Sequence, residues 1–236
     1  MREFSATADG YRAWLTEPER WLISEGILRT IEVLRKTYDN AKWLIDATSS
    51  SRNDDDSNLS EQDQLAAELI DEAMGSSAIN LARPDSSAAL RLLPDASDDP
   101  DVAQHYRELT QQGLTELKHS RLVELHKTLT NVADSPDPAH HDPFDVPSAN
   151  ADAVLAALSD VRLVLSELLE IHDELASEEL QERVLSTFFT VGGEDPDNGP
   201  PDVSPDDLVA ATFVVVGYLQ QSLVDGMLER FDPRGK

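Results

Sequence analysis

The stretch "LSDVRLVLSELLEI", residues 158–171, indicates the fold more clearly than any other part of the chain. Placed on a helical wheel at about 100° per residue, its apolar side chains other than Leu163 fill one continuous arc. Arg162 lies at one edge of this arc and Asp160 lies at the other. Side chains two residues apart on a helix point about 200° apart, so these two charges do not face each other. The pattern predicts a helix from about 151 to 171 whose apolar face is bordered by Asp160 and Arg162.

Two leucines of this helix, Leu155 and Leu163, project from the polar side. If a second element or another subunit covers that side, both charges are half-buried, and a buried charge needs a partner. Three basic residues are candidate partners of Asp160: Arg107, Lys118 and Arg121. Any of many carboxylates is a candidate partner of Arg162. We therefore interpret Asp160, Arg162, Leu155 and Leu163 as structural or interface residues that anchor the helix to its neighbours, and we assign no catalytic residue.

Helical signals recur on both sides of this stretch. Apolar periodicity predicts helices at about 17–45, 60–74, 84–94, 100–133, 177–189 and 206–231. Thr16 and Glu19 have the spacing of a capping box, and Asp99 before Pro100 is a typical helix start. The run Ser204-Pro205-Asp206-Asp207 is a start signal for the last helix. Asp9-Gly10 is a preferred hairpin turn. The fold class is therefore predicted to be all-α, a bundle of about six helices with a small N-terminal β-hairpin.

Three segments between these helices are rich in Ser, Asp, Pro or Gly and poor in apolar residues. They are predicted to be flexible, acidic loops at 47–59, 134–149 and 192–206. Nothing else in the pattern divides the chain. Residues 1–236 are therefore expected to form a single helical domain.

The chain has 236 residues, a hydrophobic content of 40% and a formal net charge of −27. Residues 1–52 carry eight basic and eight acidic residues, so the whole negative charge falls on residues 53–236. This balance opposes non-specific binding to nucleic acid or to anionic lipid. The first residues lack an apolar signal core, and the longest uncharged run, 208–224, contains too many polar residues for a membrane span. We expect a soluble, cytoplasmic protein.

The sequence contains no cysteine, which excludes disulfides, Cys-ligated metals and thiol catalysis. It has no phosphate-binding loop, dinucleotide-binding glycine pattern or nucleophile elbow. Glu116 and His119 have the Glu-x-x-His spacing of di-iron bundles, but such sites need a second pair that the chain lacks. We therefore predict no metal, no cofactor and no enzymatic activity. The alternative is a metal-dependent enzyme that uses carboxylates with His119 or His126.

A basic set runs along the first long helix: Arg29, Arg35, Lys36 and Lys42. Three acidic residues are interleaved at spacings suited to ion pairs within the helix: Glu25, Glu32 and Asp39. The arrangement favours a solvated, internally paired face. Contact with nucleic acid through the four basic residues is the alternative interpretation.

The segment "ALSDVRLVLSELLEI" resembles the central signature of an uncharacterised actinobacterial family, a domain of unknown function. The matching residues are Leu155, Leu158, Asp160, Arg162, Leu163, Val164, Leu165, Leu169 and Ile171. Val154 stands where the family has Trp, Ser159 where it has Asn, and Ser166 and Glu170 where it has Gly. Residues 90–118 and 215–228 are also similar, the latter including Tyr218 and Gln220, which we add to the expected structural or interface residues.

The resemblance implies a helical, cytosolic protein that is usually encoded beside the Clp protease adaptor and genes of sulfur-carrier and cysteine synthesis. Some members carry a transcriptional-regulator label. Our primary hypothesis is a non-enzymatic regulatory or protein-interaction module whose partner is another protein or a second copy of the chain. Transcriptional regulation through the local basic face is the alternative, and the metal-dependent enzyme is the second alternative.

Overall fold

The computed structural model describes residues 1–50, 84, 86–132, 137, 139–171, 173–189 and 204–231. These residues form three strands, six α-helices and one 3-10 turn: β1 (Arg2–Ala6), β2 (Gly10–Thr16), α1 (Glu17–Ser50), α3 (Ser87–Leu92), α4 (Pro100–Thr130), β3 (His141–Pro147), η1 (Ser148–Asn150), α5 (Ala151–Leu168), α6 (Glu174–Phe189) and α7 (Pro205–Phe231). The chain divides into two compact units. Unit 1 comprises Met1–Val33 and Leu117–Lys236, and unit 2 comprises Leu34–Glu116. That the two units form one domain stays a prediction.

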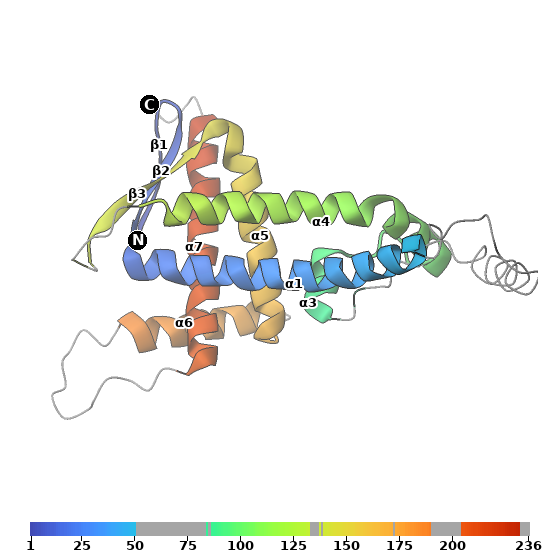
Figure 1. The fold of residues 1–236 in the computed structure, drawn as a ribbon. Helices are drawn as coiled ribbons and strands as arrows, with labels where there is room; N and C mark the ends of the chain where they lie inside the picture. The colour runs from blue at the N-terminus through green and yellow to red at the C-terminus, as the bar shows by residue number, and fades with distance from the viewer. Residues whose placement is uncertain are drawn as a thin grey trace, which may run out of the picture. The chain divides into compact units, whose positions relative to one another are not determined.

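Unit 1 is built around α5 and α7, which lie side by side (Figure 1). Strand β1 and helix α6 also pack on α7. The centre of the apolar arc predicted for α5 is buried, although Leu168 at the end of the helix is 54% exposed. The residues of α5 that are inaccessible to solvent are Ala157, Leu158, Val161, Val164 and Leu165. The first half of α1 packs closely on this pair, because a Cβ on Gly26 would lie 2.9 Å from Thr212 and 3.0 Å from Val161. Burial of these side chains is the main stabilising contribution of unit 1.

Three helices begin with the capping interactions that their sequences predict. The Glu19 carboxylate accepts a hydrogen bond from the Thr16 backbone N–H at 2.8 Å. Asp99 Oδ1 accepts from the first backbone N–H groups of α4. Ser204 and Asp207 cap α7 reciprocally, because each side chain accepts from the backbone N–H of the other. Helix α7 therefore begins at Pro205, next to the predicted start at 206, and its run of three valines, 214–216, is helical.

The N-terminal hairpin is confirmed, but it belongs to a three-stranded antiparallel sheet with the order β1-β2-β3. The prediction of a flexible loop over 134–149 is wrong for its second half, because His141–Pro147 forms β3. Phe144 and Val146 are buried and alternate with exposed neighbours, as in a half-buried strand. Proline is tolerated here because β3 is an edge strand. The turn also needs Gly10, since a Cβ there would lie 2.1 Å from the Val146 carbonyl oxygen.

Other predicted boundaries differ from the observed ones by a few residues. Helix α1 continues to Ser50, so residues 47–50 are helical where a loop was predicted, and α7 starts within the loop predicted for 192–206. The remaining parts of the predicted loops, at 51–59, 134–136 and 192–203, lie outside the described residues, as does the helix predicted at 60–74.

Helix α5 ends in a left-handed turn at a non-glycine residue. Glu170 has a φ of 54°, a conformation that glycine adopts at little cost. The N–H groups of Ile171 and Glu170 bond back to the carbonyls of Ser166 and Glu167, at 2.8 and 3.2 Å. This double hydrogen bond is a Schellman motif, and Ile171 after it is buried. Glu170 is one of the positions where the resembled family has glycine, so the chain carries local backbone strain here.

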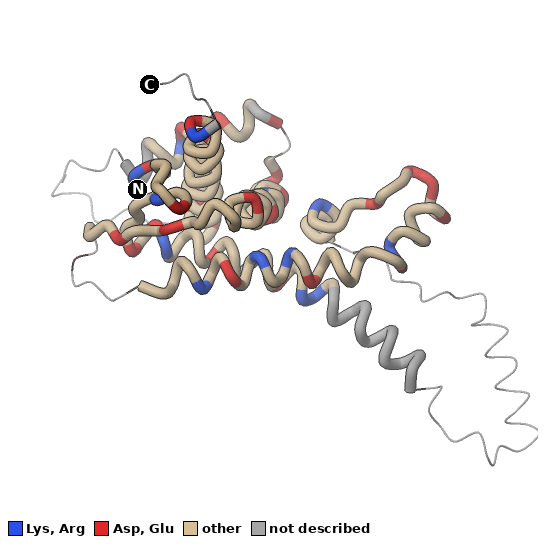
Figure 2. Tube along the Cα trace, turned by 90° about the horizontal axis from the view of Figure 1, so that it is seen from above, with Lys and Arg blue, Asp and Glu red and all other residues tan. Residues whose placement is uncertain are grey.

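Unit 2 contains the second part of α1, the short helix α3 and the first part of α4. Its buried residues are Leu34, Ala88, Ala89, Leu92, Leu93 and Ala103. Arg107 of α4 makes an ion pair with Asp95. Acidic positions are spread over several elements of the chain rather than gathered in one (Figure 2).

Among the described helices, α7 is long and apolar enough to cross a membrane, with a mean hydropathy of 1.4 over its most apolar 18 residues. Half of that window is buried inside the structure. The core helix of a soluble protein has the same length and composition.

Candidate functional site

Asp160 is the one acidic side chain among the buried residues that the structure describes. Its side chain is 5% exposed, and its Oδ1 accepts a hydrogen bond from Lys118 Nζ on α4 at 2.5 Å. Lys118 is itself only 16% exposed. Of the three cations that the sequence offered, Lys118 is thus the contact partner. The pair ties α5 to the second half of α4.

The charge of Asp160 is only partly compensated. Burial raises the pKa of this carboxyl above its ordinary value, although Lys118 and the nearby Arg121 act in the opposite direction. Its second oxygen, Oδ2, is buried and has no hydrogen-bond partner. An ion pair with this geometry fixes how two helices pack, and loss of one partner leaves a costly buried charge.

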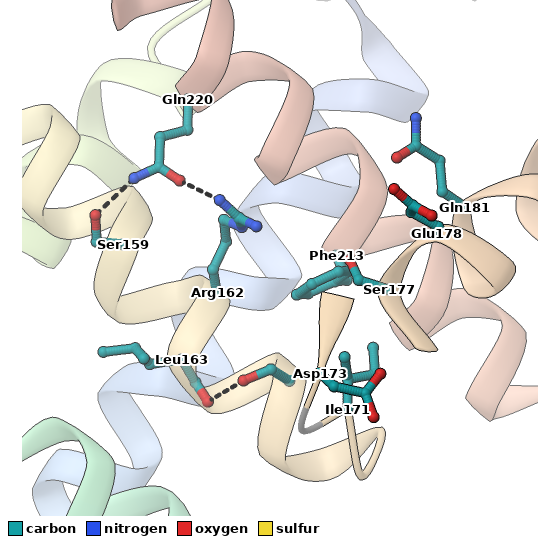
Figure 3. Close-up of a pocket in the computed structure, with 11 residues that line it drawn as sticks. Ser159, Arg162, Leu163, Ile171, Asp173, Ser177, Glu178, Gln181, Phe213 and Gln220 are labelled. Carbon is teal, nitrogen blue, oxygen red and sulfur yellow. Dashed lines mark hydrogen bonds between the residues drawn. The ribbon is translucent and has the colours of Figure 1, made fainter. Parts of the chain in front are cut away.

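Arg162 lies on another side of α5 and faces α7. Its Nη1 donates to Gln220 Oε1 at 2.9 Å, and its guanidinium lies 5.4 Å from the centre of the Phe213 ring. Gln220 in turn donates to Ser159 Oγ at 2.6 Å (Figure 3). Ser159 donates to the Leu155 carbonyl. The chain of hydrogen bonds and the aromatic ring hold the guanidinium in one place.

Arg162 has no acidic partner within ion-pair distance among the residues described. Its Nε is buried without an acceptor. The described side chains thus accept one of its five N–H groups. Gly217 leaves room beside it, since a Cβ there would approach Nε to 3.6 Å. A guanidinium that is placed but not neutralised retains the capacity to bind an anion.

The guanidinium borders an open cavity of about 790 Å³ in unit 1. The cavity is lined from α5, the turn after α5, α6 and α7: Ser159, Arg162, Leu163, Ser166, Ile171, Asp173, Ser177, Glu178, Gln181, Phe213 and Gln220. In Figure 3, Arg162 and Glu178 lie on opposite sides of the Phe213 ring. Glu178 is exposed, whereas Asp173 is occupied in capping α6 through the Ala176 N–H. The cavity is thus lined by a positive group, Arg162, and a negative group, Glu178, with the apolar Phe213 ring between them.

The structure brings together some of the residues predicted from sequence and separates others. The cavity is lined by three of them, Arg162, Leu163 and Gln220. The Leu155 carbonyl accepts the hydrogen bond of Ser159, which also lines the cavity. Asp160 faces α4 instead. Tyr218 lies on a further side of α7, where its hydroxyl donates to Glu3 at 2.7 Å, and this bond raises the pKa of the phenol.

The basic set of the first helix is divided between the two units. Arg29 lies in unit 1 and pairs with Glu25 one turn away, at 3.7 Å. Arg35 and Lys36 are exposed in unit 2, and the side chain of Lys42 lies outside the described part of the chain. Within the described ranges, no three His, Asp or Glu side chains gather as they would to hold a metal ion.

A second feature lies on the part of α4 that belongs to unit 2. Four large apolar side chains are exposed there, Leu114 among them, and three of the four lie on one side of the helix: Val102, Tyr106 and Leu109, with Leu109 70% exposed. We call these three residues the α4 face. The sequence shows the same apolar spacing in the second half of α4, yet Leu125 and Leu129 are buried. Periodicity therefore predicted both halves as apolar and did not separate core from surface.

Sequence reasoning did not single out Phe213 or Glu178. Phe213 is one apolar residue in an apolar helix, and Glu178 is one of many acidic residues. No local signal marks either of them, because each gains its role from a residue on another helix.

A family model described as a domain of unknown function (DUF2017) matches residues 1–227. No curated protein and no solved structure matches the chain.

Proposed function

The chain belongs to the DUF2017 family, whose description assigns no activity. We propose from the geometry that it is a non-enzymatic helical protein-interaction module. Its α4 face binds an amphipathic helix that carries basic residues, supplied by a partner protein. The observation that carries this proposal is the exposure of Val102, Tyr106 and Leu109 on one side of a long helix.

The α4 face has the spacing of a helix-binding surface. Its members are separated by four and three residues, which places them within about 60° of one another on the helix. Gly113, one turn further on, has no heavy atom within 4 Å of the position of a Cβ. Glycine inside a helix costs up to about 1 kcal/mol relative to alanine. No packing among the residues that the structure describes requires it, and its missing side chain allows another helix to approach closely.

The charge around the α4 face selects the kind of partner. Asp101 and Glu116 are exposed on the same helix and lie toward one edge of the face, in a chain of net charge −27. A second copy would bring like charges together, which is unfavourable. A helix with Lys or Arg beside its apolar residues complements both the apolar stripe and the acidic rim.

In this proposal the module is regulatory and acts in an actinobacterial cytosol, in regulated Clp proteolysis or in sulfur and cysteine metabolism. The resemblance to a family encoded beside genes of those processes supports this setting. The α4 face supports recognition of a protein rather than of nucleic acid, since phosphate contacts need cations.

The test compares three tagged, full-length proteins expressed in their native cells. They are the wild type, Leu109→Glu on the α4 face, and Leu228→Glu as the matched control. Leu228 is 62% exposed and lies on α7, far along the chain from the α4 face. After nuclease treatment, bound proteins are quantified by mass spectrometry, and a synthetic helix from the recovered partner is titrated by fluorescence anisotropy.

The proposal expects a partner with a basic amphipathic helix that is retained by the control and lost by Leu109→Glu. The isolated helix should bind Leu109→Glu at least about tenfold more weakly than the wild type, which corresponds to loss of one central apolar contact. The same partners on all three proteins would overturn the choice of surface. Recovery of RNA polymerase or of DNA would favour the regulator alternative, and a dimer abolished by Leu109→Glu would identify a second copy as the occupant.

A further inference from the structure

We propose that the cavity between α5, α6 and α7 binds a small zwitterion, a free amino acid or a short peptide, with Arg162 taking the carboxylate and Glu178 the ammonium group. Within the described part of the chain, neither the Arg162 guanidinium nor the Glu178 carboxylate has an ion-pair partner, and the two groups border the same cavity with apolar surface between them. This inference is independent of the α4 face, which lies in unit 2.

Arg162 is arranged as a binding group rather than as half of an internal ion pair. Gln220 fixes Nη1 and Phe213 supports the guanidinium plane. No carboxylate within the described ranges neutralises it, although Glu178 and Asp173 line the same cavity. A ligand carboxylate would accept the hydrogen bonds that the protein leaves unused.

Glu178 supplies the complementary charge. It is exposed at the start of α6, on the side of the Phe213 ring away from Arg162 (Figure 3). The two acidic groups that line the cavity disfavour a multiply charged phosphate. They favour a ligand whose negative end is balanced by a positive end.

The rest of the lining suits the body of such a ligand. Phe213, Ile171 and Leu163 provide apolar surface, and the hydroxyl of Ser177 and the amide of Gln181 lie at the rim. A volume of about 790 Å³ lies within the range of small-molecule sites and accommodates a free amino acid or a dipeptide. The distance between the carboxylate and the ammonium group of the ligand decides whether a free amino acid or a dipeptide binds.

The first experiment measures the melting temperature of the full-length protein with each of the twenty amino acids and the matching homodipeptides at millimolar concentration. We expect at least one of them to raise the midpoint by about 3 °C at ten times its dissociation constant. The best ligand is then compared by calorimetry with its amide, which lacks the carboxylate, and with its deaminated acid, which lacks the ammonium group. Each analogue should bind at least about tenfold more weakly.

Two variants with a matched control assign the groups. Glu178→Gln should weaken the zwitterion about tenfold and leave the deaminated acid unaffected, whereas Glu182→Gln, an exposed residue of α6 outside the cavity, should change neither. Arg162→Lys should weaken both carboxylate ligands. If Arg162→Lys fails to fold, the comparison of Glu178→Gln with Glu182→Gln still tests whether Glu178 binds the ammonium group. The proposal is overturned if no zwitterion shifts the midpoint, if the deaminated acid binds as tightly, or if Glu178→Gln has no effect.

Discussion

The ion pair between Asp160 and Lys118 offers the sharpest test of how unit 1 is held together. In the variant Lys118→Met, the methionine retains an apolar stem and removes the charge. Asp160, 5% exposed and already lacking a partner for Oδ2, then has no counter-ion within hydrogen-bond distance. Removing one member of a buried pair costs about 3–5 kcal/mol when the other stays ionised.

Protonation of Asp160 limits this cost. Neutralising an ordinary aspartate costs about 1.4 kcal/mol for each pH unit above its pKa, which amounts to about 4 kcal/mol at pH 7 and about 1.5 kcal/mol at pH 5. We therefore expect Lys118→Met to lower the free energy of unfolding by about 3–4 kcal/mol at pH 7 and by about 1–2 kcal/mol at pH 5.

The sign of the pH dependence follows from the direction of the pKa shift. Burial raises the pKa of Asp160 in the folded protein, so the folded state keeps the proton at pH values where the unfolded chain has lost it. Stability is then highest at acidic pH and falls as the pH rises above about 4. Without Lys118 the folded pKa is higher still, and the fall continues to higher pH.

The assay is urea unfolding followed by circular dichroism at pH 5 and pH 7, for the wild type, Lys118→Met, Asp160→Asn and the double variant. The double variant should recover most of the loss, because replacing both charges removes the unpaired one. A cost below about 1 kcal/mol at pH 7, or an equal cost at the two pH values, would refute the assignment of a buried, ionised pair.

Four further predictions concern five single substitutions. Gly26→Ala should destabilise unit 1 by about 1–3 kcal/mol in urea unfolding, since its Cβ would press on Thr212 and Val161. Gly113→Ala, where the space is open, should instead raise the free energy of unfolding by up to about 1 kcal/mol. Glu170→Gly should raise stability by about 0.5–1 kcal/mol by relieving the positive φ, and a decrease would contradict the strain. Arg162→Ala should cost about 1–2 kcal/mol in thermal unfolding through loss of Phe213 and Gln220, whereas unchanged stability with lost partner binding would place it at an interface. The bond from Ser204 lowers the pKa of Asp207, so the melting-temperature deficit of Asp207→Ala should be present at neutral pH and shrink as the pH falls below about 3.8; a constant deficit would argue against a charged cap.

The local elements of the fold could be predicted because they depend on residues that are close in the sequence. The apolar arc of α5 reflects the 3.6-residue period, and its central members are buried as the wheel placed them, whereas Leu168 at the end of the helix is exposed. The starts of α1, α4 and α7 were predicted from caps that involve residues at most four apart. The hairpin turn at Asp9-Gly10 is equally local.

Strand β3 shows where local reasoning failed. Its prolines and its short length favoured a loop, although Phe144 and Val146 alternate correctly with exposed residues. The strand exists because it pairs with β2, more than 120 residues earlier in the chain, and Arg12 and Asp145 meet across that pair in a bidentate ion pair. Such pairing gains its free energy only once distant segments meet.

The candidate sites divide in the same way. By itself, the sequence determined that Asp160 and Arg162 border the apolar face of α5, because residue spacing fixes their directions on one helix. Only the tertiary structure decided that Lys118 rather than Arg107 meets Asp160, that Phe213 supports Arg162, and that Leu109 is exposed while Leu125 is buried. A helix's own pattern specifies which way a side chain points, and the packing of other helices decides what it meets there.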